Sequence, residues 1–250
     1  MAYLDSDGVG VFYQVTGSGD GPPILLTHGF GSSSRMWASN VDALAADRPV
    51  ITWDMRGHGR SDSPGRQELY SAAACVADMA ALLDQAGTSR AVLGGLSLGG
   101  YLSLTFYLAH PDRVAALVLC DTGPGFRKDQ ARQEWNDRAL AQADRLDRDG
   151  LAALGRDGSH HSSADGVARA ARGMLTQWDA SVIDSLPSVA VPTLVLVGSR
   201  DTPFLGAASY MAAKIPGARQ VVINDAGHAA NVDAPAEFNA AVLGFLGPLD

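Results

Sequence analysis

Short apolar segments recur along the chain and alternate with longer segments that have helical periodicity. The apolar segments are rich in valine, isoleucine, leucine and alanine, and turn-forming residues lie between them. They predict β-strands at residues 11–16, 24–27, 50–53, 91–94, 115–120, 193–197 and 220–223. Strands that are apolar along most of their length and separated by helices are typical of a largely parallel sheet with both faces covered. We therefore expect an α/β fold.

Helical periodicity is clearest in residues 71–86. The apolar positions there have the i, i+3, i+4, i+7 spacing of one buried helix face: Val76, Met79, Ala80 and Leu83. Gly87 follows as a helix stop. A closing helix is predicted over residues 234–246, where Pro235 suits the first turn.

One long region interrupts the alternation of strands and helices. From residue 122 to 187 no strand-like segment occurs, and charged and small residues dominate. An insertion that follows a strand belongs over the carboxyl ends of the sheet, where open α/β sheets bind their ligands. We therefore expect a core domain formed by residues 1–121 and 188–250, with a helical lid at 122–187. An ordinary surface excursion is the alternative.

The composition narrows the classes of partner. The chain has 250 residues, of which 46% are hydrophobic, so it can bury a large core. Its 27 acidic and 19 basic residues give a net charge of −8, which disfavours nucleic acid and anionic membranes as partners. No apolar run reaches the roughly 20 residues that span a bilayer, and no secretory signal is visible. We expect a cytoplasmic protein.

Cysteine and histidine give no indication of a metal site. Cys75 and Cys120 are the only cysteines, and their positions in a predicted helix and a predicted strand suit packed thiols better than a disulfide. The six histidines lack metal-ligand spacing. The adjacent pair His160 and His161 lies in a polar segment, and we expect both side chains to be exposed.

The segment Gly95-Leu96-Ser97-Leu98-Gly99 joins an apolar strand to an apolar helix. A serine at this junction lies in a sharp turn, and the flanking glycines leave free the space that Cβ atoms would occupy. The hydroxyl then points away from the backbone, as a nucleophile must. A plain turn is the alternative, so the interpretation depends on whether a base and an acid occur at matching positions.

His228 and an aspartate supply the groups that Ser97 needs. A serine hydroxyl requires a base to remove its proton, and the base requires a carboxylate to orient it. His228 follows the last predicted strand, so it overhangs the same edge of the sheet as Ser97. Asp201 and Asp121 each follow a strand and compete for the third role. We favour Asp201 because its loop gives it reach and because the chain order becomes Ser…Asp…His. Asp225 is expected to be a turn residue.

Two backbone donors are expected to bind the oxyanion that forms when Ser97 attacks a carbonyl. One is the N–H of Leu98, at the start of the helix that follows the serine. The other is the N–H of Phe30, in the loop after residues 24–27. His28 lies in the same loop, and we expect it to support the loop by hydrogen bonding rather than to act as a base.

Taken together, these motifs resemble those of the α/β-hydrolase superfamily, over nearly the whole chain. The resemblance is carried by residues 28–31, 54–61, 95–99, 198–201, 227–228 and 233–238. It implies a mostly parallel eight-stranded sheet, a helical lid, and acyl transfer to water without a cofactor or metal. It also implies a structural role for His58. The serine at position 97 disfavours the dehalogenase and epoxide hydrolase chemistry of members that have aspartate there.

Within the superfamily, the Ser97 turn at residues 95–99 and the segment 118–122 look like those of small serine esterases and β-ketoadipate enol-lactonases. The expected function is hydrolysis of a small-molecule ester or lactone by water. The candidates for the substrate pocket are Trp135, Trp178 and Phe126. A substrate carboxylate would need a cation from the lid; the candidates are Arg127, Lys128 and Arg132, which also suit a solvated helix face.

Two alternatives stay open. A menaquinone-pathway lyase of this fold would carry the same Ser-His-Asp set. A small-molecule receptor of this fold would bind its ligand under the lid and turn it over slowly or not at all. The carbon–carbon bond hydrolases of the meta-cleavage pathways are disfavoured, because they have an asparagine in the segment that reads Ser32-Ser33-Ser34 here.

Overall fold

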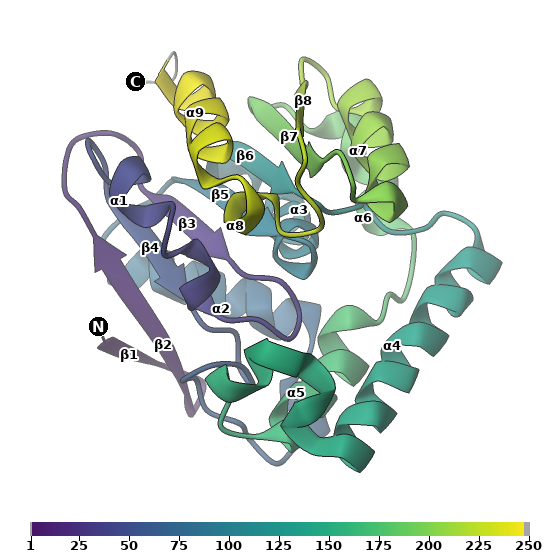
Figure 1. The fold of residues 1–250 in the computed structure, drawn as a ribbon. Helices are drawn as coiled ribbons and strands as arrows, with labels where there is room; N and C mark the ends of the chain where they lie inside the picture. Colours follow the sequence, from purple (N-terminus) through teal and green to yellow (C-terminus); the bar gives the residue numbers. More distant parts are fainter. Residues whose placement is uncertain (1, 248–250) are drawn as a thin grey trace.

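The computed structural model describes residues 2–247, which form an eight-stranded sheet flanked by helices (Figure 1). The strand order is β1-β2-β4-β3-β5-β6-β7-β8. β2 pairs antiparallel with β1 and with β4, and all the other pairs are parallel, so the predicted fold class is confirmed. The strands are β1 (Ala2–Ser6), β2 (Val9–Thr16), β3 (Ile24–Thr27), β4 (Val50–Trp53), β5 (Ala91–Leu96), β6 (Val114–Cys120), β7 (Thr193–Gly198) and β8 (Arg219–Ile223).

The one strand missing from the predicted set is β1. The other strands match the predicted segments to within two residues at each end. β1 lies at the edge of the sheet and pairs only with β2, so most of its side chains stay partly exposed. Its sequence therefore lacks the continuous apolar character by which the inner strands are identified.

The inner strands bury side chains on both faces, because successive side chains point to opposite sides of a sheet. In β3, Leu25 belongs to one apolar cluster and Leu26 to the other. The helices on the Leu25 side are α2 (Ala72–Gln85), α3 (Leu98–Ala109) and α7 (Thr202–Lys214), and those on the Leu26 side are α1 (Val41–Leu44) and α9 (Pro235–Leu246) (Figure 1). Because the strands from β3 to β8 run parallel, their carboxyl ends lie at the same edge of the sheet.

Two helices end close to where the sequence predicts. α2 begins after Ser71, whose hydroxyl accepts a hydrogen bond from the Ala74 N–H at 3.0 Å. It ends before Gly87, which has a φ of 67° and so takes a conformation that favours glycine. α9 begins at Pro235, where the missing N–H costs nothing because first-turn donors have no partner within the helix.

Residues between β6 and β7 form a helical insertion with its own apolar cluster. Its elements are α4 (Asp129–Asp149), α5 (Ala164–Ala170) and α6 (Ser181–Ser185), with 3₁₀-helical segments at Gly150–His160 and Leu186–Ser188 and a π-helical segment at Ala171–Leu175. Ala143 and Leu146 of α4 pack against Val167 and Ala168 of α5. Phe30, from the loop after β3, packs against this cluster. The insertion therefore contacts the loop that carries one of the expected oxyanion donors.

No helix among residues 2–247 is long and apolar enough to cross a bilayer. Cys75 and Cys120 are separate buried thiols, and burial raises the pKa of both. Within the described residues, no cluster of three or more histidine, cysteine or acidic side chains has the arrangement of a metal site.

Candidate active site

Ser97 lies in a strained turn between β5 and α3. Its φ of 54° and ψ of −116° are values that residues with a side chain rarely adopt. A Cβ at Gly95 would collide with the backbone of Gly99, and a Cβ at Gly99 would collide with the carbonyl group of Thr27. The two glycines thus allow α3 to approach β3 and β5 closely. Strain of this kind costs about 1–3 kcal/mol and is typical of functional sites.

His228 lies in the loop after β8, and Asp201 orients its ring. His228 Nδ1 and Asp201 Oδ2 are 2.8 Å apart. An ionised carboxylate can only accept hydrogen bonds, so Nδ1 carries the proton and Nε2 keeps its lone pair. Asp201 is 5% exposed, whereas the side chain of His228 is 45% exposed. Phe204 packs on the imidazole with ring centroids 4.8 Å apart. The ring therefore has a defined tautomer and an accessible edge.

Backbone hydrogen bonds hold the loops that carry these two side chains together. The Arg200 N–H donates to the Ala226 carbonyl at 2.9 Å. The Ser199 N–H donates to the Ile223 carbonyl, also at 2.9 Å. Asp225 has a φ of 53° and lies at a turn, the position expected from the sequence. The separation of Asp201 from His228 is thus set by main-chain contacts.

Asp121, the competing carboxylate, makes no hydrogen bond to His228. One of its oxygens accepts from the Gly198 N–H at 2.7 Å, and the other accepts from the Ala230 N–H at 3.2 Å. Burial raises the pKa of Asp121 to about 6. Gly198 ends β7 just before the turn that carries Asp201, and Ala230 follows the loop that carries His228. Asp121 therefore ties the two loops together from below, while Asp201 alone of the two contacts the imidazole.

The loop after β3 lies directly against the serine. A Cβ placed on Gly29 would be 3.5 Å from the Ser97 Cβ. Within the described chain, neither the Phe30 N–H nor the Leu98 N–H donates to an acceptor. Leu98 is the first residue of α3, where the helix itself offers its N–H no partner. Both expected oxyanion donors are thus free at the edge of the sheet that presents Ser97.

His28 supports this loop, as the sequence predicts. Its Nε2 accepts from the Met55 N–H at 3.0 Å, and its Nδ1 donates to the Gly29 carbonyl at 2.7 Å. These bonds need a neutral imidazole with the proton on Nδ1. Burial lowers the pKa of His28 to about 4, which is consistent with that neutral form.

His161 is a correction to the sequence-based expectation of an exposed side chain. It is only 8% exposed, and both ring nitrogens bond to backbone groups of the core. Its Nδ1 accepts from the Gly59 N–H at 2.9 Å, and its Nε2 donates to the Gly31 carbonyl at 2.9 Å. The Gly31 N–H in turn donates to His58 Nε2 at 3.2 Å. We call His58 and His161 the histidine clamp, because they hold both polar groups of Gly31, next to Phe30.

Nothing in the local sequence indicates that clamp. His58 lies in the 54–61 turn and His161 in the insertion, so they meet only through tertiary packing, with ring centroids 5.6 Å apart. Burial lowers the pKa of His161, and it lowers the pKa of His58 well below its ordinary value. Both rings are therefore neutral at pH 7.

The 54–61 turn is built around a buried carboxylate. Asp54 accepts from the Ser34 N–H at 2.7 Å and from the Arg60 N–H at 2.9 Å. Arg56 pairs with the buried Asp78, with Nε 2.8 Å from Oδ2. These contacts give the turn the structural role that the sequence implies.

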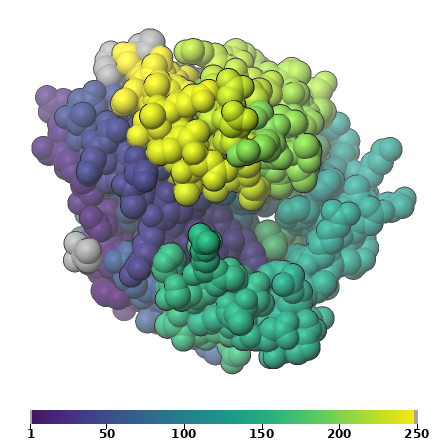
Figure 2. All heavy atoms as spheres, viewed as in Figure 1, coloured from purple at the N-terminus to yellow at the C-terminus, as the bar shows by residue number. Residues whose placement is uncertain are grey.

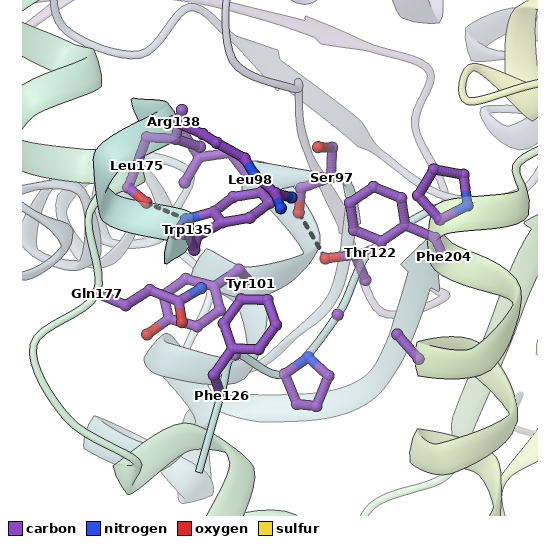
Figure 3. A pocket seen from close by; sticks show the side chains of 15 residues that line it. Ser97, Leu98, Tyr101, Thr122, Phe126, Trp135, Arg138, Leu175, Gln177 and Phe204 are labelled. Atoms are coloured by element: carbon purple, nitrogen blue, oxygen red, sulfur yellow. Dashed lines mark hydrogen bonds between the residues drawn. The ribbon is translucent and has the colours of Figure 1, made fainter. Parts of the chain in front are cut away.

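A cavity of about 390 Å³ opens beside Ser97 between the core and the insertion (Figure 3). In Figure 2 the surface is hollowed between the yellow C-terminal segments and the green and teal insertion. The cavity is mostly apolar. Its lining comes from two helices of the core, α3 and α7, and from three parts of the insertion: its first residues, α4 and the segment that follows α5. The residues are Ser97, Leu98, Tyr101, Thr122, Gly123, Pro124, Gly125, Phe126, Trp135, Arg138, Leu175, Gln177, Pro203, Phe204 and Ala207.

Two of the three aromatic residues expected in the substrate pocket lie in this lining. Phe126 and Trp135 pack on each other with ring centroids 5.9 Å apart, and Trp135 Nε1 donates to the Leu175 carbonyl at 2.7 Å. Trp178 does not line the cavity and is 83% exposed. Its neighbour Gln177 faces inward, because Asn136 holds the Gln177 backbone, and the next side chain along the chain therefore faces solvent.

The cation that lines the cavity is not one of the three that the sequence suggests. Arg127 pairs with Asp184 at 2.6 Å, and Arg132 bonds to the Phe126 carbonyl at 3.1 Å. Neither of them lines the cavity, and Lys128 does not line it either. The cation that does is Arg138, which the charge pattern along α4 could not distinguish from its neighbours.

Comparison with known proteins identifies the family of the fold. The family model of the alpha/beta hydrolase fold matches residues 22–165. The Bacillus subtilis (strain 168) protein named "Putative 2-succinyl-6-hydroxy-2,4-cyclohexadiene-1-carboxylate synthase" is 30% identical, over 96% of this chain and 96% of its own. The 3-oxoadipate enol-lactonase 1 of Acinetobacter baylyi is 27% identical, over 93% of this chain and 91% of its own.

The solved structure of a malate-bound thermophilic esterase from Thermogutta terrifontis is also similar. It has a TM-score of 0.86 and 30% sequence identity, and the match covers 99% of this chain and 97% of that one. The similarity thus extends over the whole fold, including the insertion. This chain belongs to the α/β-hydrolase family.

Proposed function

We propose that this chain is a serine hydrolase that cleaves carboxylic ester or lactone bonds of small molecules. Ser97 is the nucleophile, His228 the base and Asp201 the group that orients the base. The observation that carries the proposal is the strained, positive-φ Ser97 beside a cavity, with a hydrogen-bonded His228–Asp201 pair at the same edge of the sheet. Relatives named as an esterase and an enol-lactonase act on this type of bond.

In the first half of the reaction, Ser97 Oγ attacks the substrate carbonyl carbon and its proton passes to His228 Nε2. The carbonyl oxygen becomes an oxyanion, which accepts hydrogen bonds from the Phe30 and Leu98 N–H groups. The imidazolium that forms is stabilised by Asp201 through Nδ1. When the carbonyl re-forms, the alkoxide leaves and takes the proton from Nε2. The product is an alcohol, or the free hydroxyl end of an opened lactone, and an acyl group remains on Ser97.

In the second half, water attacks the acyl carbon and gives a proton to His228 Nε2. The second oxyanion uses the same two donors. Its collapse releases the carboxylic acid and returns the proton to Ser97 Oγ. Side chains and backbone N–H groups of the protein, together with water, carry every step, so the proposed reaction has no cofactor.

The insertion at 122–187 is proposed to act as a lid. Its residues Phe126, Trp135, Arg138 and Leu175 form one wall of the cavity, and Ser97 and Phe204 lie on the opposite wall (Figure 3). A substrate bound there is enclosed between the two. The shape of this wall therefore selects the acyl group.

Hydrolysis of p-nitrophenyl acetate and p-nitrophenyl butyrate by the wild type and by Ser97→Ala tests the proposal. We expect turnover by the wild type and its loss in the variant. A small-molecule receptor would instead show no turnover of any ester or lactone while it still bound a ligand.

A further inference from the structure

The cavity beside Ser97 contains one charged side chain, and it is a cation. Arg138 lines the cavity, whereas none of the aspartates and glutamates among the described residues does. The chain as a whole has the opposite bias, with 27 acidic and 19 basic residues. The local charge of the cavity is therefore positive in a protein whose net charge is −8.

Arg138 reaches the cavity from α4. It lies three residues after Trp135, so both project from one face of the helix. In Figure 3 its side chain runs past Trp135 towards the Ser97 side of the cavity. The position is at the mouth, since Arg138 itself is exposed. An anion on a bound molecule can thus reach the guanidinium without being fully desolvated.

The other arginines of α4 are engaged, and Arg138 is not. Arg132 pairs with Asp129, Arg148 pairs with Asp149, and Arg145 donates to Gln142 Oε1 at 3.5 Å. Arg138 makes no hydrogen bond or ion pair with any residue in the range 2–247. The acidic residues nearest to it in sequence accept hydrogen bonds from other side chains: Glu134 from Gln130 at 3.1 Å, and Asp137 from Gln133 at 2.8 Å. Its donors remain available to a ligand.

Gln177 provides a second, independent indication of a polar ligand. It is only 8% exposed, and its Oε1 is buried without a hydrogen-bond partner among the described residues. Its backbone is fixed, because Asn136 bonds to both its N–H and its carbonyl at 2.8 Å. A buried acceptor without a partner is costly, and a donor on a bound molecule would remove that cost. In Figure 3, Gln177 lies near Tyr101, away from Arg138.

We propose that the substrate is an anionic ester or lactone, with a carboxylate that binds Arg138 and a hydroxyl or N–H group that donates to Gln177 Oε1. The guanidinium fork matches a carboxylate with two parallel N–H···O bonds. The apolar side chains of Phe126, Trp135 and Phe204 contact the hydrocarbon between these groups. A single guanidinium balances a single negative charge, which favours a carboxylate over a phosphate. This inference rests on the proposed hydrolysis at Ser97.

The test compares half esters with neutral esters of equal length. Monoethyl succinate, glutarate and adipate are matched with ethyl butanoate, pentanoate and hexanoate. We expect the wild type to have a higher kcat/KM for the half esters. Arg138→Gln should lower the kcat/KM of the half esters about tenfold, which is the low end for the loss of a charge-assisted hydrogen bond because Arg138 is exposed. The kcat/KM of the neutral esters should stay within about twofold of the wild-type value.

Arg145→Gln is the matched control, since Arg145 lies on the same helix outside the cavity and the net charge changes equally. It should leave both substrate classes unchanged. An equal effect of Arg138→Gln on half esters and neutral esters, or no effect on either, would overturn the carboxylate assignment. For Gln177, the wild type should prefer monoethyl 3-hydroxyglutarate to monoethyl glutarate, and Gln177→Leu should remove that preference. An unchanged preference would overturn the donor assignment.

Binding separates this inference from the hydrolysis on which it rests. Calorimetry of monoethyl glutarate with Ser97→Ala needs no turnover, and the double variant Ser97→Ala/Arg138→Gln should bind about tenfold more weakly. Equal affinities would contradict the role of Arg138 even if hydrolysis at Ser97 were established. Full esterase activity in Ser97→Ala would instead contradict the proposed function.

Discussion

The histidine clamp gives the sharpest prediction of how the insertion affects catalysis. His161→Phe keeps an aromatic ring at a site that is 8% exposed, but it removes both nitrogens. The Gly31 carbonyl and the Gly59 N–H then lose the partners that now lie at 2.9 Å. Each unpaired buried group costs about 1–3 kcal/mol. Both glycines are buried, so we expect the free energy of unfolding to fall by about 2–6 kcal/mol.

The same substitution should lower kcat. Gly31 follows Phe30, and the clamp holds both the N–H and the carbonyl of Gly31. When the carbonyl loses His161, the loop is no longer held in place, and the position of the Phe30 N–H is no longer fixed. Losing one oxyanion donor raises the barrier by about 2.7–4 kcal/mol, or roughly 100- to 1000-fold in kcat. His161 does not line the cavity, so the KM for p-nitrophenyl butyrate should change little.

Steady-state kinetics with p-nitrophenyl butyrate and urea unfolding measure the two effects. His160→Phe is the matched control, because the adjacent ring is more exposed and has only a distant ionic partner, Asp157 at 4.0 Å. It should leave kcat unchanged. A His161→Phe variant with wild-type kcat would refute the reasoning, whatever its stability.

The clamp also predicts a dependence on pH. The folded protein lowers the pKa of His161 below its ordinary value of 6.5, because the ring is buried. The stability that it contributes is therefore fully present above pH ~6.5 and is lost as the pH falls through the lower folded-state pKa. The stability difference between the wild type and His161→Phe should shrink between pH 7 and pH 5. Urea unfolding of both proteins across that range measures it, and a constant difference would show that His161 does not titrate with unfolding.

The remaining predictions concern the carboxylates of Asp201 and Asp121 and the glycine-flanked turn at Ser97. Asp201→Asn should lower kcat by about 10³- to 10⁴-fold with a folded protein, because the imidazole loses its tautomer-fixing acceptor. Asp121→Asn should act mainly on stability, since its carboxylate accepts from backbone groups; kinetics and urea unfolding of both variants test the assignment, and a collapse of kcat in Asp121→Asn alone would reverse it. Gly99→Ala should abolish activity and destabilise the fold, because the added Cβ would collide with the Thr27 carbonyl. Its control is Gly244→Ala in α9, where a Cβ meets nothing within 4 Å and thermal unfolding should show a gain of about 0.5–1 kcal/mol.

The features predicted well from the sequence are those encoded by contiguous residues. The inner strands are buried on both faces, so their apolar segments mark them directly. The strained turn at Ser97 needs glycines at fixed positions, and these also appear in the sequence. The Asp201–His228 contact was expected from chain order, and the two side chains lie at hydrogen-bond distance.

The features that the sequence did not indicate depend on how the insertion packs. His161 is buried because backbone groups of the core, far away in sequence, satisfy both of its nitrogens. Arg138 lines the cavity and Trp178 does not, because the rotation of α4 and the Asn136–Gln177 contacts decide which side chains face inward. Charge and aromaticity alone do not encode these orientations. β1 escaped prediction because an edge strand exposes much of its surface.

The central claim is that Ser97 is the nucleophile, and covalent labelling tests it most directly. A fluorophosphonate ester reacts with an activated serine and releases fluoride, which leaves a phosphonyl group on Oγ. Peptide mass spectrometry after such treatment should find one adduct, on the peptide that contains Ser97. The rate of labelling should fall in step with esterase activity in His228→Ala. An adduct on another residue, or labelling and ester hydrolysis that persist in Ser97→Ala, would contradict the account.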